Sequence, residues 1–403
     1  MQTSRMSASF LAVAAFSCAA SAGWTVTHLH PEGASLSTAG GVKGAMQVGF
    51  VHDDATHRPR ARLWSDAAGS IVVLHPVGAF SSSASGTDGV RQVGAVQYSG
   101  SGPHATIWTG TANSLVDLHP AGAVSSQANS ISGNQQVGLA RFGSFDHAGY
   151  WTGTAASWVD LHPTTHRFSI AWGGRGGQQT GFTYSQNFIP HAALWTGTAA
   201  SWVDLHPATA ALGSEAYHSD GVQQVGFTYE DDGSTYNAAL WNGTAGSYAN
   251  LNPVGATFSE ASDVDAGVQV GYATIDSVER AGLWRGTRES WTDLSQYLSE
   301  EYGTSRAAGV DVDGDVIRVL GWAYNVPAQR QEAVLWTFSP CDSIDYNLDG
   351  LFPDTQDIAD FLLCFSGGAC PNPDVDFNND DLFPDTADIG ALLRVFGGGL
   401  CAE

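Results

Sequence analysis

Residues Ser125 to Pro163 read SSQANSISGNQQVGLARFGSFDHAGYWTGTAASWVDLHP, and this stretch decides the fold. It holds four short apolar or alternating runs, at Ser125–Ile131, Gln136–Phe142, His147–Trp151 and Ser157–Leu161. The residues between the runs are rich in Gly, Ser, Asn and Asp, which favour turns because they tolerate positive φ or bond their own backbone. Four strands in a unit of this length are typical of a propeller blade, whereas a helical solenoid would need long stretches of 3.6 periodicity.

Three landmarks of this unit recur along the chain with a period of about 44 residues. The first is a QVG-type element, which ends at Gly49, Gly94, Gly138, Gly181, Gly226, Gly271 and Gly321. The second is a tryptophan at the end of an apolar strand, at Trp64, Trp108, Trp151, Trp195, Trp241, Trp284 and Trp336. The third is a DLHP-type element, whose leucines are Leu29, Leu74, Leu118, Leu161, Leu205, Leu251 and Leu294. Seven of each landmark predict seven blades.

The two ends of the repeat region complement each other. After residue 22 the chain opens with WTVTHLHP, which is the last strand of a unit without its first three, and no DLHP element follows Trp336. We therefore expect Trp24–His30 to pair with the strand that ends at Trp336, so that the ring has no exposed edge. The predicted fold is mainly β, a seven-bladed β-propeller closed by an N-terminal strand, followed by a small α-helical module.

The repeat region, about Gly23 to Pro340, resembles the HAF-type extracellular repeat family. The units of that family read roughly HAFLW, then DLG, then A..IN..GQVVG, while this chain uses DLHP in place of DLG. The resemblance implies a secreted repeat protein and names no activity.

The first 22 residues are typical of a secretory signal peptide. Arg5 supplies the positive charge, Phe10 to Phe16 form a short apolar run, and Ala20-Ser21-Ala22 has the small-residue cleavage pattern. The apolar run is too short to span a bilayer, so we expect a secreted or cell-surface protein without a transmembrane segment. The predicted domains are 1–22, 23–340 and 341–403.

The composition argues against nucleic-acid binding. The formal net charge is −24, and so acidic a chain repels phosphate backbones. No GxSxG, HExxH or Walker loop is present, and the sequence does not single out a catalytic residue.

The histidine and tryptophan repeats favour structural roles. His30, His75, His119, His162 and His206 invite a metal-binding reading, but a ring separates equivalent positions of successive blades too widely for shared ligation. The tryptophans are expected to pack between blades. The run Asp311-Val312-Asp313-Gly314-Asp315 has the alternating carboxylates of a short calcium loop, yet its alignment with other repeats favours a hairpin turn.

The chain changes character after Pro340. Residues 341–403 contain 13 acidic residues and one basic residue, Arg394. Two segments repeat at a spacing of 31 residues, DYNLDGLFPDTQDIADFLLCF from Asp345 and DFNNDDLFPDTADIGALLRVF from Asp376. Each begins with Asp-x-Asn-x-Asp, the alternate-oxygen pattern that converges on Ca²⁺.

The predicted ligands of two calcium ions are side-chain oxygens and one backbone carbonyl in each copy. They are Asp345, Asn347, Asp349, Leu351, Asp354 and Asp357 in the first copy, and Asp376, Asn378, Asp380, Leu382, Asp385 and Asp388 in the second. Gly350 permits the sharp turn of the first loop, and Asp381 stands in its place in the second, which weakens the second predicted site.

Each loop leads into a predicted amphipathic helix. Ile358, Phe361, Leu362 and Phe365 are expected on one face of the first helix, and Ile389, Leu392, Leu393 and Phe396 on one face of the second. Cys341 to about Cys401 closely resembles the GC-type dockerin modules of exported bacterial proteins, including LFPDTQDI and the FGGG-x-C ending. The resemblance implies a cohesin-like partner.

Four cysteines lie in the same segment: Cys341, Cys364, Cys370 and Cys401. An even number of cysteines in a small exported module predicts two disulfides, with three possible pairings that the sequence does not distinguish. A zinc site is the alternative, but no CxxC pair supports it.

These observations predict a secreted binding protein. The propeller would be the scaffold for a glycan or protein ligand, and the calcium-dependent module would attach it to a cell-surface or complex partner. The alternatives are a polysaccharide-acting enzyme tethered by the module, and a lectin-like propeller. A carboxylate cluster at one channel mouth would favour the enzyme, and a row of exposed aromatics the lectin.

Overall fold

The computed structural model describes residues 23–53, 57–66, 70–209, 212–230, 235–341, 346–347, 354–368, 374–378 and 384–397. The chain divides into two compact units, one spanning Trp24–Ser339 and one that contains the residues from Pro340 onward. The predicted signal peptide lies outside the described residues. Within the described part of the chain, no helix is long and apolar enough to span a membrane.

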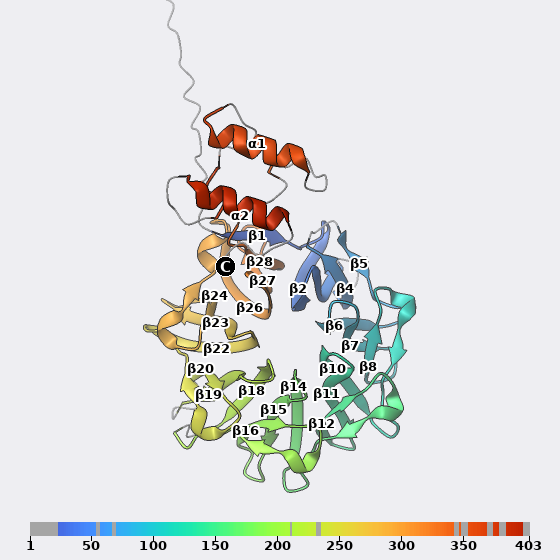
Figure 1. Cartoon of the computed structure of the whole chain (residues 1–403). Helices are drawn as coiled ribbons and strands as arrows, with labels where there is room; N and C mark the ends of the chain where they lie inside the picture. The colour runs from blue at the N-terminus through green and yellow to red at the C-terminus, as the bar shows by residue number, and fades with distance from the viewer. Residues whose placement is uncertain are drawn as a thin grey trace, which may run out of the picture. The chain divides into compact units, whose positions relative to one another are not determined.

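The larger unit consists of seven four-stranded antiparallel sheets arranged around a centre (Figure 1). The predicted seven-bladed β-propeller is therefore confirmed. In each sheet the strand nearest the centre comes first in the blade, and each later strand lies further out. Short strands and glycine-rich turns suit this architecture. Strands such as Gln92–Gln97, Gln179–Tyr184 and Gln224–Tyr229 are buried along almost their whole length, because each blade packs both of its faces against its neighbours.

The first four blades contain the following strands, from the centre outward. They are β2 (Ala34–Lys43), β3 (Met46–Asp53), β4 (Pro59–Ser65) and β5 (Val72–Val73); β6 (Ser81–Thr87), β7 (Gln92–Gln97), β8 (Pro103–Trp108) and β9 (Val116–Asp117); β10 (Ser125–Ser132), β11 (Gln135–Phe142), β12 (Phe145–Trp151) and β13 (Val159–Asp160); and β14 (Phe168–Gly173), β15 (Gln179–Tyr184), β16 (Pro190–Trp195) and β17 (Val203–Asp204).

The last three blades follow the same order. They are β18 (Ser214–Ser219), β19 (Gln224–Tyr229), β20 (Tyr236–Trp241) and β21 (Ala249–Asn250); β22 (Ala256–Asp265), β23 (Val268–Ile275), β24 (Val278–Trp284) and β25 (Thr292–Asp293); and β26 (Tyr302–Asp313), β27 (Val316–Asn325), β28 (Arg330–Phe338) and β1 (Trp24–His28). Short 3-10 helices lie on the outer connections: η2 (Ala112–Ser114), η3 (Ala155–Ser157), η4 (Ala199–Ser201), η5 (Ala245–Ser247), η6 (Arg288–Ser290) and η7 (Ser295–Tyr297).

The seventh sheet joins strands from both ends of the repeat region. Its order is β1-β28-β27-β26, and β1 is antiparallel to β28 with Val26 opposite Trp336. The ladder continues beyond the strand, because Leu29 donates its backbone N–H to the Ala333 carbonyl at 2.9 Å.

The core lies between the blades. All seven repeat tryptophans and all seven repeat leucines have no exposed surface. Trp151 of the third blade packs with Ile107 and Leu118 of the second and with Ala128 of its own inner strand. The expected role of the tryptophans in packing between blades is thus confirmed, and burial of such large aromatic groups is a main source of stability.

A β-bulge explains the QVG glycines. Every inner strand shifts register after a buried alanine, as between Ala128 and Ser130 in β10. A Cβ atom built on the opposing Gly138 would lie 2.0 Å from the Gln127 carbonyl oxygen, so a side chain cannot fit there. Bulges strengthen the local twist and redirect the extra residue.

The C-terminal unit contains two helices, α1 (Thr355–Phe365) and α2 (Thr386–Phe396). Asp354 and Asp385 cap them, and each forms a capping box with the aspartate three residues later. Their shared core includes Tyr346, Phe361, Phe377 and Leu392.

The predicted apolar faces of these helices need a correction. Leu362 is 42% exposed and Leu393 is 51% exposed, whereas Cys364 and Ala391 are buried. The apolar stripe is therefore rotated toward the small residues Cys364 and Ala391, which permit close packing. Hydrophobic spacing alone does not distinguish these two arrangements.

Candidate functional site

Each bulged residue of the inner strands lines at least one of two cavities. They are Gly40, Ser85, Asn129, Trp172, Tyr217, Ser262 and Ala308, one from each blade. The flanking alanine and the opposing glycine are repeated in every blade, but the bulged residue varies among Gly, Ser, Asn, Trp, Tyr and Ala. The seven-fold repeat thus loses its symmetry at the position that a bulge turns toward the centre.

Five of these bulged residues line one pocket of about 350 Å³. Its lining residues are Ser85, Gln127, Asn129, Trp172, Tyr217, His218, Glu260 and Ser262, and we call it the aromatic pocket. Trp172 meets Tyr217 edge to face, with ring centroids 6.1 Å apart and planes at 89°. This volume is near the lower end of the range of about 300–1,000 Å³ that is usual for small-molecule sites, so the pocket suits one side chain or a small group.

Two carboxyl groups in this region hold their protons more strongly than an exposed glutamate does. Burial, followed by the neighbouring Glu260, raises the pKa of Glu215 to about 7. Burial also raises the pKa of Glu260 to about 7, against the opposing effect of Arg306. Arg306 binds a different carboxylate. Its Nε donates to Glu279 Oε2 at 2.8 Å, and its Nη2 donates to Glu279 Oε1 at 2.6 Å.

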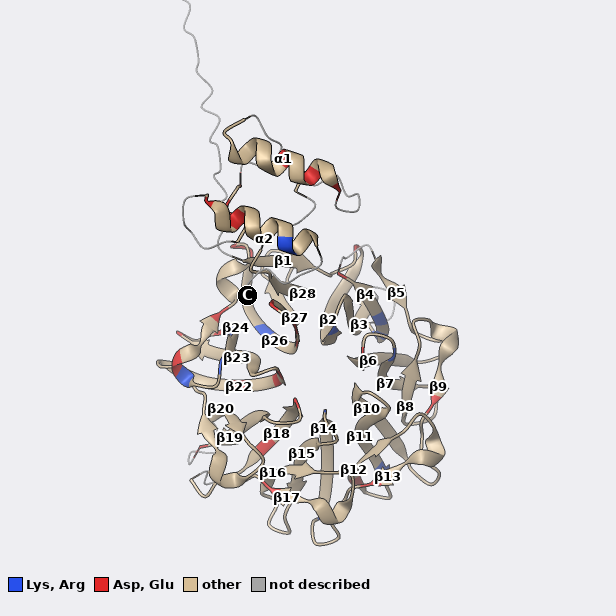
Figure 2. Cartoon of the chain, in the orientation of Figure 1, with Lys and Arg blue, Asp and Glu red and all other residues tan. Residues whose placement is uncertain are grey.

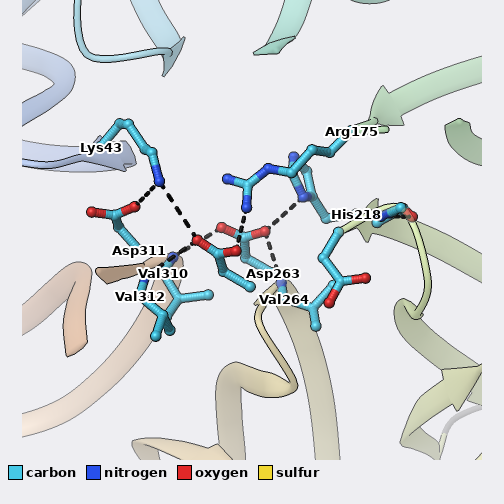
Figure 3. Close-up of polar contacts among 12 residues, drawn as sticks. Lys43, Arg175, His218, Asp263, Val264, Val310, Asp311 and Val312 are labelled. Atoms are coloured by element: carbon cyan, nitrogen blue, oxygen red, sulfur yellow. Dashed lines mark hydrogen bonds and ion pairs between the residues drawn. The ribbon is translucent and has the colours of Figure 1, made fainter. Parts of the chain in front are cut away.

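Charged side chains form ion pairs and hydrogen bonds with one another at the inner ends of the strands (Figure 3). Lys43 Nζ lies 2.5 Å from Asp311 Oδ1 and 3.9 Å from Asp265 Oδ2, and Arg175 also binds Asp265. Figure 2 shows that the blades carry few charged residues and that several of them lie beside the centre of the ring. These ion pairs connect the first and fourth blades with the sixth and seventh.

His218 is part of the same network. Its Nδ1 lies 2.7 Å from Asp263 Oδ1 and its Nε2 lies 3.1 Å from Ser130 Oγ. Burial alone would raise the pKa of Asp263, but His218 and the backbone N–H groups of Val310 and Val264 outweigh it and lower that pKa. Both ring nitrogens of His218 are engaged within the protein. A cavity of about 90 Å³ lies beside this network, lined in part by Arg175, His218 and Asp263.

The repeated histidines have a structural role, as the sequence favoured. His119 lies with its Nδ1 2.8 Å from Ser126 Oγ and its Nε2 3.0 Å from the Ala123 carbonyl oxygen. Ser126 Oγ in turn accepts the backbone N–H of Ala105 at 2.9 Å. The chain of bonds joins the outer connection of one blade to the first strand of the next. Equivalent contacts join His30 to Ser37, His75 to Ser82, His162 to Ser169 and His206 to Ser214.

The Asp311–Asp315 run forms the predicted hairpin. Strand β26 ends at Asp313, β27 begins at Val316, and Gly314 between them has a φ of 58°. Asp311 is used in the ion pair with Lys43 and accepts the Gly44 N–H at 2.8 Å.

The predicted calcium ligands are described only in part. Asp345, Asp349, Leu351, Asp380 and Leu382 lie outside the described residues. Of the others, Asp357 accepts the Asn347 N–H at 3.3 Å, and Asp388 accepts the Asn378 N–H at 3.2 Å. Asp354 and Asp385 act as helix caps, and Asp376 is also described. No group of three or more His, Cys, Asp or Glu side chains suited to a metal occurs within the described residues.

Cys341 and Cys364 are both disulfide-bonded, which excludes zinc ligation by these two thiols. Cys370 and Cys401 lie outside the described residues.

No family model and no curated protein matches this chain. Solved structures do match it. The β-propeller domain of the Trilobed protease from Pyrococcus furiosus, which has an open velcro topology, is similar over 75% of this chain and 95% of that one, with a TM-score of 0.51 and 10% identity. The acylaminoacyl peptidase of Pyrococcus horikoshii is similar over 75% of this chain and 51% of its own, with a TM-score of 0.51 and 11% identity.

A puromycin-hydrolyzing peptidase of Mycobacterium tuberculosis is similar over 75% of this chain and 53% of its own, with a TM-score of 0.50 and 13% identity. This chain thus spans about half the length of these two peptidases. Identities this low show the fold alone. The functional prediction from the sequence, a secreted binding propeller attached by a dockerin-like module with an enzyme or a lectin as alternatives, is nevertheless wrong, because the propellers similar to this one belong to peptidases.

The aromatic pocket was not predicted from the sequence. Its signal was present, because Trp172 and Tyr217 are aromatic where the other five blades have Gly, Ser, Asn or Ala. Aligning the repeats and asking where they disagree would have identified this position.

Proposed function

We propose that this chain is a peptidase-related propeller that binds a peptide segment in the aromatic pocket. The observation that carries the proposal is the pocket itself, with the bulged aromatic rings of Trp172 and Tyr217 on adjacent inner strands. Aromatic rings bury large area with few torsions to fix, so such a pair can anchor a side chain. Peptide as the ligand class is drawn from the peptidases whose propellers are similar.

The polar residues of the pocket suit a peptide backbone. Gln127, Asn129, Ser85 and Ser262 supply amide and hydroxyl groups on the same lining as the rings. Aromatic rings together with convergent polar groups are a usual combination in a small binding site, and here the polar residues outnumber the rings. The proposal is binding rather than cleavage, since the sequence contains neither the GxSxG nucleophile motif nor the HExxH metalloprotease motif.

Calorimetry with a set of capped pentapeptides tests this function. The intact protein should bind at least one of them with a Kd in the micromolar range, and Trp172→Ala should weaken binding about tenfold or more. Phe188→Ala is the matched control, because Phe188 is 56% exposed and does not line the pocket. Binding of oligosaccharides with no peptide binding, or an unchanged affinity in Trp172→Ala, would overturn the proposal.

We also propose that the C-terminal unit is a dockerin-like pair of half-loops that binds calcium. The support is the equivalence of its two halves, where an aspartate in the first turn of each helix both completes a capping box and accepts the N–H of the loop asparagine ten residues earlier. Carboxylate and amide oxygens in this spacing are the ligands that Ca²⁺ prefers. Export through the signal peptide remains a prediction, and it is tested by the N-terminal residue of the secreted protein.

A further inference from the structure

We propose that the aromatic pocket recognises a cationic side chain, lysine or arginine, of the peptide it binds. This inference rests on the proposed peptide-binding function and specifies its substrate class. It is carried by the placement of Glu260 beside Trp172 and Tyr217 in one pocket.

The first step is that the pocket combines a carboxylate with aromatic faces. A cation over an aromatic ring gains about 0.5–2 kcal/mol, more when water is excluded. A carboxylate on the same wall adds a charged hydrogen-bond acceptor, which is stronger than a neutral one. A neutral apolar side chain would pack on the rings, but Glu260 would then be desolvated without a cationic partner to offset the cost.

The second step is that the protein's own cations are occupied. Arg306 forms two hydrogen bonds to Glu279 and stacks over Tyr272 with 3.9 Å between its Cζ and the ring centroid. Lys43 and Arg175 are paired with Asp311 and Asp265. Within the described part of the chain, no lysine or arginine forms an ion pair with Glu260, and Arg306, which acts on it electrostatically, is bonded to Glu279. A cationic ligand would therefore supply the ion-pair partner that Glu260 lacks among these residues.

The third step is that the neighbouring polar groups offer acceptors. Asn129 donates its Nδ2 to the Ala171 carbonyl at 2.8 Å, which leaves the side-chain oxygen as the atom it can offer a ligand. His218 is held between Asp263 and Ser130 and contributes no further group. An ammonium group carries three donors and no acceptor, so it matches a wall of carboxylate, amide oxygen and hydroxyl groups.

The test compares three capped peptides, acetyl-Gly-Gly-Xaa-Gly-Gly-amide with lysine, norleucine or glutamate as Xaa. Calorimetry on the full chain should show the lysine peptide binding about tenfold tighter than the norleucine peptide, and the glutamate peptide weakest. Glu260→Gln should bring the lysine and norleucine affinities within about twofold of each other, while the norleucine affinity stays unchanged. Glu289→Gln, which removes one exposed charge from η6 of the same blade, should keep the discrimination.

The outcomes separate the two proposals. If none of the three peptides binds, the peptide-binding function fails. If all bind with equal affinity, or if Glu260→Gln keeps the preference for lysine, peptide binding stands and the cationic specificity is overturned. A preference for glutamate would also overturn it. Because Glu260→Gln removes a buried charge, a folded variant is expected, and circular dichroism of each variant verifies this.

Discussion

The Nδ1 atom of His119 lies 2.8 Å from the Oγ atom of Ser126, and this contact joins two blades. Burial and the nearby His104 lower the pKa of His119, which keeps the ring neutral and able to accept the serine proton. Asn252, after β21 of the fifth blade, stands where five other repeats have this histidine. It accepts from Ser259 at 2.7 Å and donates to the Ala256 carbonyl at 3.2 Å.

His119→Asn should therefore be tolerated, whereas His119→Leu should not. The asparagine can repeat both bonds that Asn252 makes, but leucine would leave the Ser126 hydroxyl and the Ala123 carbonyl without a partner. We expect a loss of about 1–3 kcal/mol for leucine and less than about 1 kcal/mol for asparagine, measured by urea unfolding. Equal losses in the two variants would contradict this role.

Gly138→Ala should destabilise the third blade. The added methyl group would lie 2.0 Å from the Gln127 carbonyl oxygen, which the β-bulge holds in place. Overpacking against backbone costs about 3 kcal/mol, so the melting temperature should fall by several degrees. Gly246→Ala serves as the control, because its Cβ would meet no atom within 4 Å. A melting temperature equal to that of the control would refute the close approach.

Glu260→Gln should make the protein more stable at pH 8 than the unchanged chain. Burial raises the pKa of Glu260 from 4.5 to about 7 in the folded state. A raised carboxyl pKa gives stability that is present below the unfolded value and is lost as the pH rises through the folded value. The advantage of glutamine should thus be absent near pH 4 and grow to about 1–2 kcal/mol by pH 8, after discounting for partial solvent exposure.

Glu332→Gln is the matched control with the opposite sign. Burial alone would raise the pKa of Glu332, but hydrogen bonds from Tyr302 and Arg330 outweigh it and lower that pKa. The ionised carboxylate therefore stabilises the fold above the unfolded pKa, and the variant should be less stable at pH 8. The ionisable groups Arg306, Glu279, Tyr272 and Glu215 act on Glu260. The free energy of unfolding of each variant is therefore compared with that of the unchanged chain across the whole pH range. A flat difference for Glu260→Gln would contradict the assignment.

Thr27→Pro should open the ring. Leu29, just beyond the end of β1, donates its N–H to the Ala333 carbonyl. Thr27 of β1 lies two residues earlier and opposite Leu335, so its N–H points to the same side, toward β28. Proline has no N–H and would detach β1, which exposes the edge of β28 to other chains. Size-exclusion chromatography should show aggregation, whereas Thr27→Val should stay monodisperse. A monodisperse proline variant would show that β1 is not needed to close the ring.

The repeat pattern predicted the blades because each landmark has a packing reason. The glycine is required by the bulge, the tryptophan and leucine are buried between blades, and the histidine bonds the next serine. The aromatic pocket was not predicted, because it lies at the residues where the repeats differ and a search for repetition passes over them. Burial of Glu260 and the bonding of its neighbour Arg306 to Glu279 depend on the ring, which packs different strands against one another.

Calcium should raise the thermal stability of the C-terminal unit without changing the unfolding of the propeller. The described residues of the unit are mostly acidic where they are charged, and Arg394 in the last turn of α2 is the one basic residue among them. Figure 2 shows red segments on both helices and a blue segment on α2. Carboxylates that repel one another in the absence of a cation are stabilised when one binds, so binding free energy adds to folding free energy. In scanning calorimetry of the full chain, calcium should shift one transition upward and a chelator should reverse the shift.

Asp345→Ala with Asp376→Ala should abolish the shift, whereas Asp360→Asn should retain it because Asp360 is not a predicted ligand. A shift that survives the double substitution, or no calcium binding at all, would leave the disulfides of Cys341 and Cys364 as the main restraint on this unit.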